Sequence, residues 1–449
     1  MYEDDDMMYT PSSSTAMYTT YWYLLPPLLY ILYRFLLKPA AAGKLWDARG
    51  GVEEGGDAGK VTVAMSVTNM PFNCPDERMA AGCAFDAQKG CMYVYGGLGT
   101  AEYLKTLHRY DSSSYEWQDV KRGRDDPGGR VHVKMVVSGK KLVMFGGSTA
   151  ESDFSDDLFV MDVSGDGAAT KGWVKKSKFE GEVPKGRYGH SMVSFGSYGH
   201  VIVFGGLGEG NIYLNDMWIL DTRLTHCSWE YVKPKGDFWP KAREGHAACV
   251  PEGLGCMVLL GGFNGSYDVS QPGVIEVFDF ETFSWSQKPT CGEYPPKGSN
   301  GDIFDLWNGC GKLAAISESN GGIFNQVHVL DVGVKPWCWS EVQLDWKGDW
   351  TMIPGQRSYF SSCYDPHQAV MYVFGGKSGT AGGEGMLHGT LVCVNAAEVA
   401  GIDLGEGEGE EEVVENNQGG IGEGQVDFGE NNNRGTTLPG QDRYRKKNL

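Results

Sequence analysis

The chain carries little positive charge for its length. It has 39 Lys and Arg residues against 58 Asp and Glu residues, which gives a formal net charge of −19 over 449 residues. Proteins that bind nucleic acid concentrate basic side chains along the phosphate backbone. The acidic balance therefore argues against nucleic acid as the main partner, although it leaves room for a local basic patch.

The short motifs of several enzyme classes are also missing. The sequence contains no nucleophile elbow, no phosphate-binding loop and no metalloprotease helix. Its eleven cysteines are an odd number and lack the paired spacing of a zinc site. We therefore expect no metal and no cofactor. The cysteines are typical of buried, reduced thiols in a cytoplasmic protein.

A hydrophobic run that ends in two glycines recurs along the chain. Val201–Phe204 is one such run, and it predicts a buried strand that stops at a tight turn. The pairs are Gly96 and Gly97, Gly146 and Gly147, Gly205 and Gly206, Gly261 and Gly262, and Gly375 and Gly376. Their regular return indicates an internal repeat of about 50–60 residues.

Other residues repeat in register with these glycines. An arginine precedes the first glycine by 18 residues in four units and by 16 in the fifth: Arg78, Arg130, Arg187, Arg243 and Arg357. A further unit is degenerate, with Ser299 at the arginine position and Ser317 and Glu318 at the glycine positions. A tryptophan follows by 21–27 residues in five units: Trp117, Trp173, Trp229, Trp285 and Trp339.

Each unit has room for four short strands separated by Gly- and Asn-rich turns. In the third unit we predict them at about 189–195, 201–204, 217–221 and 229–233. Units of this kind, with a glycine pair after the second strand and a tryptophan in the fourth, resemble kelch repeats. The resemblance covers about residues 60–400 and implies an all-β, six-bladed kelch-type β-propeller.

The last unit lacks a fourth strand that carries tryptophan. A β-branched run at residues 60–69 precedes Arg78 at the offset of a fourth strand, with Ala64 at the tryptophan position. We expect this N-terminal strand to complete the last blade, because closure leaves no long exposed edge.

The resemblance places the residues before each first strand near the mouth of the central channel. Arg78, Arg130, Arg187, Arg243 and Arg357 would then ring one face, which suits an acidic or carboxylate-bearing protein segment. Alternatively, each arginine pairs with a turn carboxylate or a backbone carbonyl of a neighbouring blade. His132, His190 and His246 follow three of the arginines, but a packing role explains them better than a metal site does.

Two function classes remain open. We expect a non-enzymatic, monomeric scaffold or adaptor for protein–protein interaction that binds a partner segment on the loop face near the channel. The alternative is a kelch-fold enzyme, similar to a sugar epimerase or an oxidase, that acts on a small ligand in the channel. Glu244 and Asp302 are its nominal acid–base candidates, although both fit turn positions as well.

Additional tryptophans lie in an extended segment before Arg357. Trp346 and Trp350 occur there beyond the repeat tryptophan Trp339. Exposed tryptophans often anchor interfaces, so they are candidate partner contacts. Packing against the edge of the propeller is the other interpretation.

The ends of the chain differ from the repeats. Residues 1–59 are an acidic and apolar segment followed by a linker, and residues 401–449 are an acidic Gly/Glu-rich tail with a basic end, so we expect both to be disordered. The apolar stretch 21–37 contains Pro26, Pro27 and Arg34. Two interpretations of this stretch remain open: a membrane-associated segment, which is an anchor or a signal, and an inert segment.

Overall fold

The computed structural model describes residues 61–396 and residue 399, apart from several gaps. The gaps are 68–73, 122, 124, 166–171, 180, 196–198, 224–226, 234, 266–272, 296–299, 307–310, 319–325, 347–356 and 379–385. The chain divides into two units, Met1–Ala58 and Gly59–Leu449, and every described residue belongs to the second. Residues 1–59 and 401–449, with their predicted disorder and the stretch 21–37, lie outside the described residues, as do Ser299 and Trp350.

The first half of the described chain forms successive antiparallel sheets. One sheet contains β2 (Gly82–Asp86), β3 (Cys91–Tyr95), β4 (Leu107–Asp111) and β5 (Glu116–Val120) in chain order. The next contains β7 (Lys134–Ser138), β8 (Lys141–Phe145), β10 (Leu158–Asp162) and β11 (Trp173–Lys176), beside the short pair β6 (Arg130–Val131) and β9 (Ser148–Thr149). The third contains β12 (Arg187–Tyr188), β13 (Ser191–Phe195), β14 (His200–Gly208), β15 (Ile212–Asp221) and β16 (Ser228–Tyr231).

The second half repeats the same antiparallel order. β17 (Ala247–Cys249), β18 (Cys256–Leu260), β19 (Val274–Asp279) and β20 (Ser284–Gly292) pair in sequence. So do β21 (Asn300–Leu306), β22 (Lys312–Glu318), β23 (Gln326–Asp331) and β24 (Trp337–Trp346). The last group is β25 (Ser361–Asp365), β26 (Val370–Phe374) and β27 (Leu391–Asn395), and β1 (Val61–Val67) pairs antiparallel with β27.

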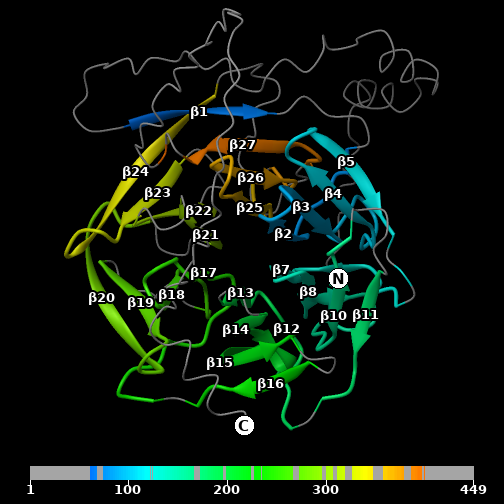
Figure 1. The fold of residues 1–449 in the computed structure, drawn as a ribbon, viewed down its shortest axis with the longest axis horizontal. Coiled ribbons are helices and arrows are strands. Elements are labelled where there is room, and N and C mark those ends of the chain that lie inside the picture. Colours follow the sequence, from blue (N-terminus) through cyan, green and yellow to red (C-terminus); the bar gives the residue numbers. More distant parts are fainter. Residues whose placement is uncertain are drawn as a thin grey trace, which may run out of the picture. The chain divides into compact units, whose positions relative to one another are not determined.

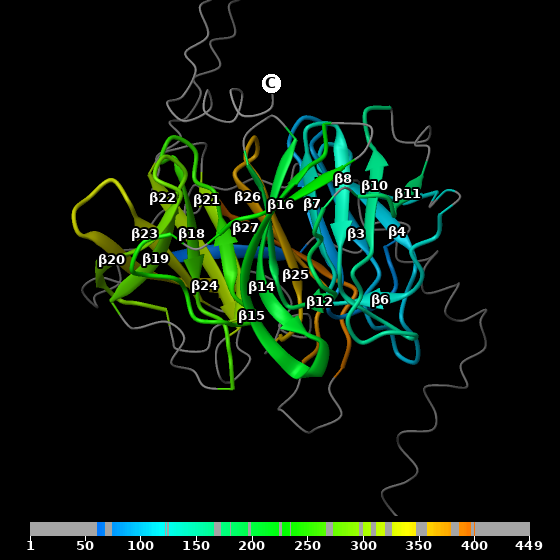
Figure 2. The same ribbon diagram turned by 90° about the horizontal axis from the view of Figure 1, so that it is seen from below.

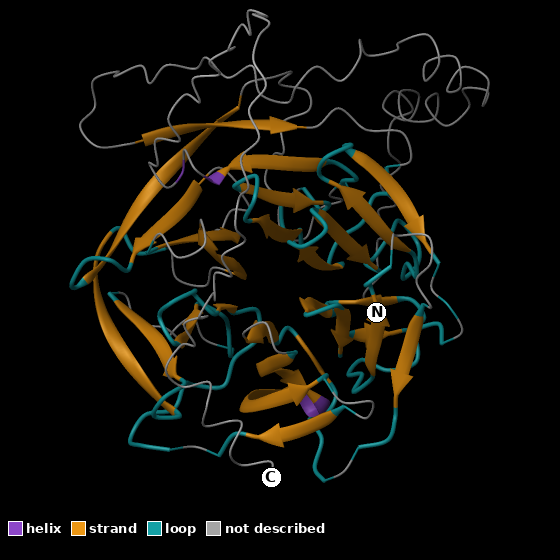
Figure 3. Cartoon of the chain, in the orientation of Figure 1, coloured by secondary structure: helices purple, strands orange, loops and turns teal. Residues whose placement is uncertain are grey.

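The first strands of these groups lie around a common centre. β2, β7, β13, β17, β21 and β25 contact one another in that order, and β25 contacts β2. Figure 1 shows these strands innermost and β5, β11, β16, β20 and β24 farther out. Figure 3 shows strands throughout and scarcely any helix; η2 (Glu209–Asn211) is one short 3-10 turn. The chain is all-β in its described part, with a β-propeller-like arrangement.

The hydrophobic core lies between neighbouring groups. Strands β3, β14, β18 and β26 are buried along their whole length, which explains why they are apolar runs in the sequence. Repeat tryptophans pack on the aromatic residue before the glycine pair of the preceding group: Trp173 on Tyr95, Trp229 on Phe145 and Trp285 on Phe204. Trp117 packs on Phe374 at 5.1 Å between ring centroids, so this contact joins the first group to the last.

The outer strands around β24 pair in a second way. β20 is parallel to β24 at Thr290–Gly292, and β1 is parallel to the C-terminal half of β24 at Val61–Met65. These ladders merge the groups from β17 onward into one twelve-stranded sheet. Trp346 ends β24 opposite Met65. Its predicted role as a partner contact stays a prediction, as does that of Trp350.

Two local expectations differ from the structure. In the third unit the strand does not stop at Gly205 and Gly206: β14 continues to Gly208 with an irregular register, because it pairs with the extended β15. In the degenerate unit, Ser317 and Glu318 remain in β22 opposite Gly301 and Asn300. Among the described residues, no helix is long and apolar enough to cross a membrane.

Candidate functional site

The five repeat arginines are buried, with side chains tied to their own strand groups. Each residue is 0–1% exposed. In each, Nη1 donates a hydrogen bond to the carbonyl of the first glycine of its unit. The pairs are Arg78–Gly96 at 3.0 Å, Arg130–Gly146 at 3.3 Å, Arg187–Gly205 at 3.0 Å, Arg243–Gly261 at 3.1 Å and Arg357–Gly375 at 3.1 Å. The spacing of 18 residues in four units and 16 in the fifth therefore reflects one repeated contact.

A second partner of each arginine varies between the groups. Arg187 binds both carboxylate oxygens of Asp216, at 2.6 and 2.8 Å, and Arg243 forms an ion pair of 2.8 Å with the buried Glu276. Arg130 contacts Asp157 at 3.3 Å. Arg78 instead contacts Thr106 and His108, and Arg357 contacts Thr390. Burial lowers the pKa of Arg78 and Arg357 to about 10, so both remain protonated at neutral pH.

The arginine backbone links neighbouring groups. The N–H of the second glycine of one unit donates to the arginine carbonyl of the next: Gly97 to Arg130 and Gly147 to Arg187 at 2.9 Å, and Gly206 to Arg243 at 2.8 Å. Gly376 donates to Arg78 at 2.8 Å, although the two residues are almost 300 positions apart. Glycine is required beside these bonds, because a Cβ on Gly96 or Gly146 would lie 2.5–2.6 Å from the same carbonyl oxygen.

These contacts correct the expectation of an open arginine ring. A guanidinium group that is 0–1% exposed and bonded to backbone carbonyls cannot receive a partner carboxylate without leaving its site. The structure supports pairing with a turn carboxylate or a backbone carbonyl, although in the arginine's own group and not in the neighbouring one. The arginines thus hold together one end of the strand groups, here called the arginine face. Figure 2 shows β6 and β12, which carry Arg130 and Arg187, toward the lower edge.

Residues that follow the arginines lie close to one another at this face, and this region is here called the mouth. Two positions after each arginine the backbone is left-handed, with φ of 54° at Ala80, 52° at His132 and 56° at Tyr359, and glycine at 189 and 245. Backbone bonds join these positions: Ala80 N–H donates to the Tyr359 carbonyl at 2.7 Å and His132 N–H to the Ala80 carbonyl at 2.8 Å. Left-handed backbone is strained for residues other than glycine and often marks functional sites.

Aromatic rings cluster at this mouth. The His132 ring lies 5.5 Å from Tyr188 and 5.7 Å from Tyr359, and Phe154 stacks on Tyr188 at 5.5 Å. Tyr359 is 48% exposed. The sequence analysis missed this cluster, whose only signal is that Tyr188 and Tyr359 come one and two residues after repeat arginines.

Glu244 brings a carboxyl group to the same region. It follows Arg243, is half-buried, and lies against Gly189. Burial raises its pKa from the ordinary value for glutamate. An acidic group thus lies beside the tyrosines, where the sequence predicted a ring of arginines.

A cavity of about 320 Å³ lies among the innermost strands. Both apolar and polar residues line it: Phe85, Met135 and Val193 are apolar, and Lys134 and Ser194 are polar. The described residues contain no group of three or more His, Cys, Asp or Glu side chains placed to hold a metal ion. His246 Nε2 lies 3.0 Å from Ser191 Oγ, and His190 is fully buried against Phe145. Asp302 lies in β21, but its side chain is not described, so its pairing with Glu244 stays untested.

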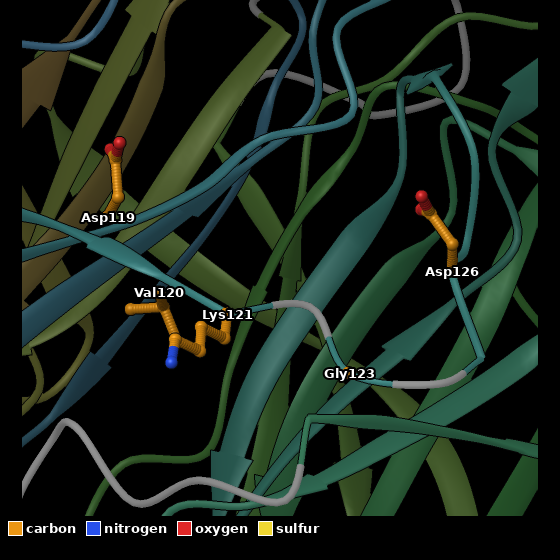
Figure 4. Close-up of a pocket in the computed structure, with 5 residues that line it drawn as sticks. All are labelled: Asp119, Val120, Lys121, Gly123 and Asp126. Atoms are coloured by element: carbon orange, nitrogen blue, oxygen red, sulfur yellow. The ribbon is translucent and has the colours of Figure 1, made fainter.

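A second hollow of about 440 Å³ lies on the connection after β5. Figure 4 shows Asp119 and Asp126 on separate segments, with Lys121 turned away from both. Asp119 is already within 2.8 Å of His108 Nδ1. The hollow thus has no convergent set of groups that would bind a ligand.

The buried and half-buried histidines predict a loss of stability in acid. Burial is the main cause that lowers the pKa of His108, His132 and His388 to about 4, and those of His190 and His246 well below 6.5. The unfolded chain therefore takes up protons first as the pH falls below 6.5. We expect the free energy of unfolding to decrease between pH 6.5 and about 4, measured by denaturant titration. Asparagine also tolerates left-handed backbone, so His132→Asn should make the free energy of unfolding depend less steeply on pH. An equal pH dependence for wild type and variant would contradict the lowered pKa of His132.

Comparisons with known proteins agree with the repeat and its contacts. Residues 61–175 match the model of the KLHDC2/KLHL20/DRC7 Kelch-repeats domain. Residues 61–175 are therefore a kelch-repeat region. The match begins at β1 and ends within β11. Three of the four units that follow carry the same arginine and glycine-pair pattern, and the degenerate unit does not.

Several curated proteins are similar to this chain. Host cell factor of Drosophila melanogaster is 28% identical over 321 residues, which are 65% of this chain and 20% of that protein. Host cell factor 2 of Homo sapiens is 29% identical over 248 residues, 50% of this chain and 29% of that protein. Acyl-CoA-binding domain-containing protein 4 of Arabidopsis thaliana is 27% identical over 232 residues, 49% of this chain and 32% of that protein. The chain thus spans less than a third of each relative.

Proposed function

We propose that this protein is a non-enzymatic scaffold that binds a protein segment at the mouth of the arginine face. The observation that carries the proposal is the aromatic cluster of His132, Tyr188 and Tyr359 beside Glu244. Tyrosines of this kind bury a large area at a low cost in side-chain entropy and are enriched at interaction hot spots. Rigid loops on a closed ring lower the ordering cost of binding.

We further propose that the ring is a six-bladed propeller closed by β1, with residues 60–400 as its domain. Three contacts between chain ends support closure. β1 pairs with β27 at Met65–Val67, Gly376 donates to the Arg78 carbonyl, and Trp117 packs on Phe374. A buried cluster that includes Val94, Tyr110 and Tyr372 also spans this junction.

The charge around the mouth favours a partner segment that is basic or neutral, in place of the acidic segment that an open arginine ring would select. Loops that follow glycine pairs carry the exposed acids Glu102, Asp153 and Glu209. Together with Glu244 these acids bring negative charge to this face, which also carries the exposed Lys105, Lys185 and Lys241. Complementary potentials steer association and select partners, so we propose a segment with lysine, arginine or amide groups and an apolar anchor for the tyrosines.

The test compares partner capture by wild type and by a Tyr359→Asn/Glu244→Gln double variant. Asparagine tolerates the left-handed backbone at position 359, so the melting temperature should stay close to that of wild type. Partners identified by quantitative mass spectrometry should bind the variant about tenfold less tightly or worse, the loss expected for two interface anchors.

The matched control is Lys140→Gln, in the turn between β7 and β8 at the opposite end of the strands. It should retain every partner that wild type retains. If Lys140→Gln loses partners and the double variant keeps them, the binding surface is at the opposite end and the proposal fails.

A further inference from the structure

Two cysteines face each other across the outer strands β20 and β24. The parallel register sets Cys291 opposite Cys338, between the pairs Thr290–Trp337 and Gly292–Trp339. In-register residues on neighbouring strands are about 4.8 Å apart, within the Cα separation that a disulfide spans. Cys291 Sγ also donates to the carbonyl of Pro336 at 4.0 Å, two residues before Cys338. Cys291 is exposed and Cys338 is half-buried, so a soluble oxidant can reach the pair.

The pair lies at an unusual junction. The group from β21 to β24 is the degenerate unit, which has Ser299 at the arginine position and Ser317 and Glu318 at the glycine positions. In the sheets from β2 to β16, the outer strands β5, β11 and β16 pair within their own groups. β20 and β24 also pair within their own groups, but here they pair with each other in addition, and Glu293 N–H donates to the Trp339 carbonyl at 3.2 Å. Outer-strand pairing thus joins the two groups where the sequence lacks the repeated arginine and glycine pair.

We propose that Cys291 and Cys338 form a reversible intramolecular disulfide, which makes this junction a site of oxidative modification. A low-molecular-weight disulfide such as oxidised glutathione is the oxidant. The thiolate of Cys291 attacks one glutathione sulfur, and a glutathione thiolate leaves. The thiolate of Cys338 then attacks Cys291 Sγ, and the second glutathione thiolate leaves. The two cysteines lose two protons and two electrons, and one glutathione disulfide is reduced to two thiols.

The surroundings assign the order of these steps. Cys291 is the more exposed thiol and meets the oxidant first. The hydrogen bond with Cys291, followed by burial and the charge of Asp331, raises the pKa of Cys338. A thiol with a raised pKa is a poorer first nucleophile, which fits the second step. The link would close the chain segment from 291 to 338 and restrict the unfolded state.

The experiment uses the full chain, reduced and then equilibrated with oxidised glutathione. We expect wild type to lose two alkylatable thiols, to yield a non-reduced peptide pair that contains Cys291 and Cys338, and to melt at a higher temperature. Reduction should reverse all three changes. Cys338→Ser should instead retain a glutathione adduct on Cys291 and show no rise in melting temperature.

Cys83→Ser is the matched control, because Cys83 is also half-buried in a strand but lies opposite Val94. It should behave like wild type. A glutathione adduct that persists on Cys291 in wild type would overturn the proposal. So would a disulfide-linked dimer, or a wild-type protein that keeps both thiols.

Discussion

Arg243→Ala is expected to lower the free energy of unfolding by about 3–5 kcal/mol, because it leaves one partner of a buried ion pair without the other. The Arg243 and Glu276 side chains are 0% and 5% exposed, and their charged atoms are 2.8 Å apart. The variant also removes the bond to the Gly261 carbonyl. Denaturant unfolding at neutral pH measures the loss.

Two comparisons isolate the cause of this loss. Lys241→Ala, two residues earlier and exposed, should change stability by less than about 0.5 kcal/mol. Arg243→Lys keeps the charge but cannot bind the glycine carbonyl and the carboxylate through a planar fork, so it should fall between the other two. An Arg243→Ala protein as stable as Lys241→Ala would show that the arginine is not a structural element.

Gly375→Ala is expected to cost about 2–5 kcal/mol, as the sum of left-handed strain and overpacking. Gly375 has φ of 72°, and an added Cβ would lie 2.5 Å from the Arg78 carbonyl oxygen. That oxygen belongs to the first strand group, and it also accepts the hydrogen bond from Gly376. The substitution therefore strains the junction between the two ends of the repeat array.

Gly253→Ala is the control for this variant. Gly253 has φ of 77° but nothing within 4 Å of an added Cβ, so it carries the strain without the clash. It should lose only about 1–2 kcal/mol. Equal losses for the two variants, measured by the same denaturant titration, would contradict a close contact between Gly375 and Arg78.

Much of the fold could be predicted because the repeat makes the same contact several times. The interval from Arg187 to Gly205 became interpretable only when four units had the same spacing, and the structure gives its cause, a bond from the guanidinium to the glycine carbonyl. The kelch repeats, matched over residues 61–175, and the all-β arrangement of the described residues followed from this pattern and are confirmed. The glycine pairs were also informative, since few other residues fit where a neighbouring carbonyl approaches so closely.

The candidate site was less predictable, because its features do not repeat. A sequence position does not show whether an arginine points into the core or toward solvent, so the burial of Arg78 and Arg357 was not visible. His132, Tyr188 and Tyr359 come from different units, and only the ring arrangement brings them together. The parallel pairing of β20 with β24 joins strands of two groups, which no local pattern encodes.

The central claim is that stability and binding at the arginine face reside in different residues. The most direct measurement is partner affinity, determined on folded protein alongside melting temperature, for Arg243→Lys and for Tyr359→Asn/Glu244→Gln. We predict that Arg243→Lys melts lower yet retains its partners, whereas the double variant melts like wild type and loses them. The opposite pattern would contradict this account: if Arg243→Lys loses its partners and Tyr359→Asn/Glu244→Gln keeps them, the arginines belong to the binding site.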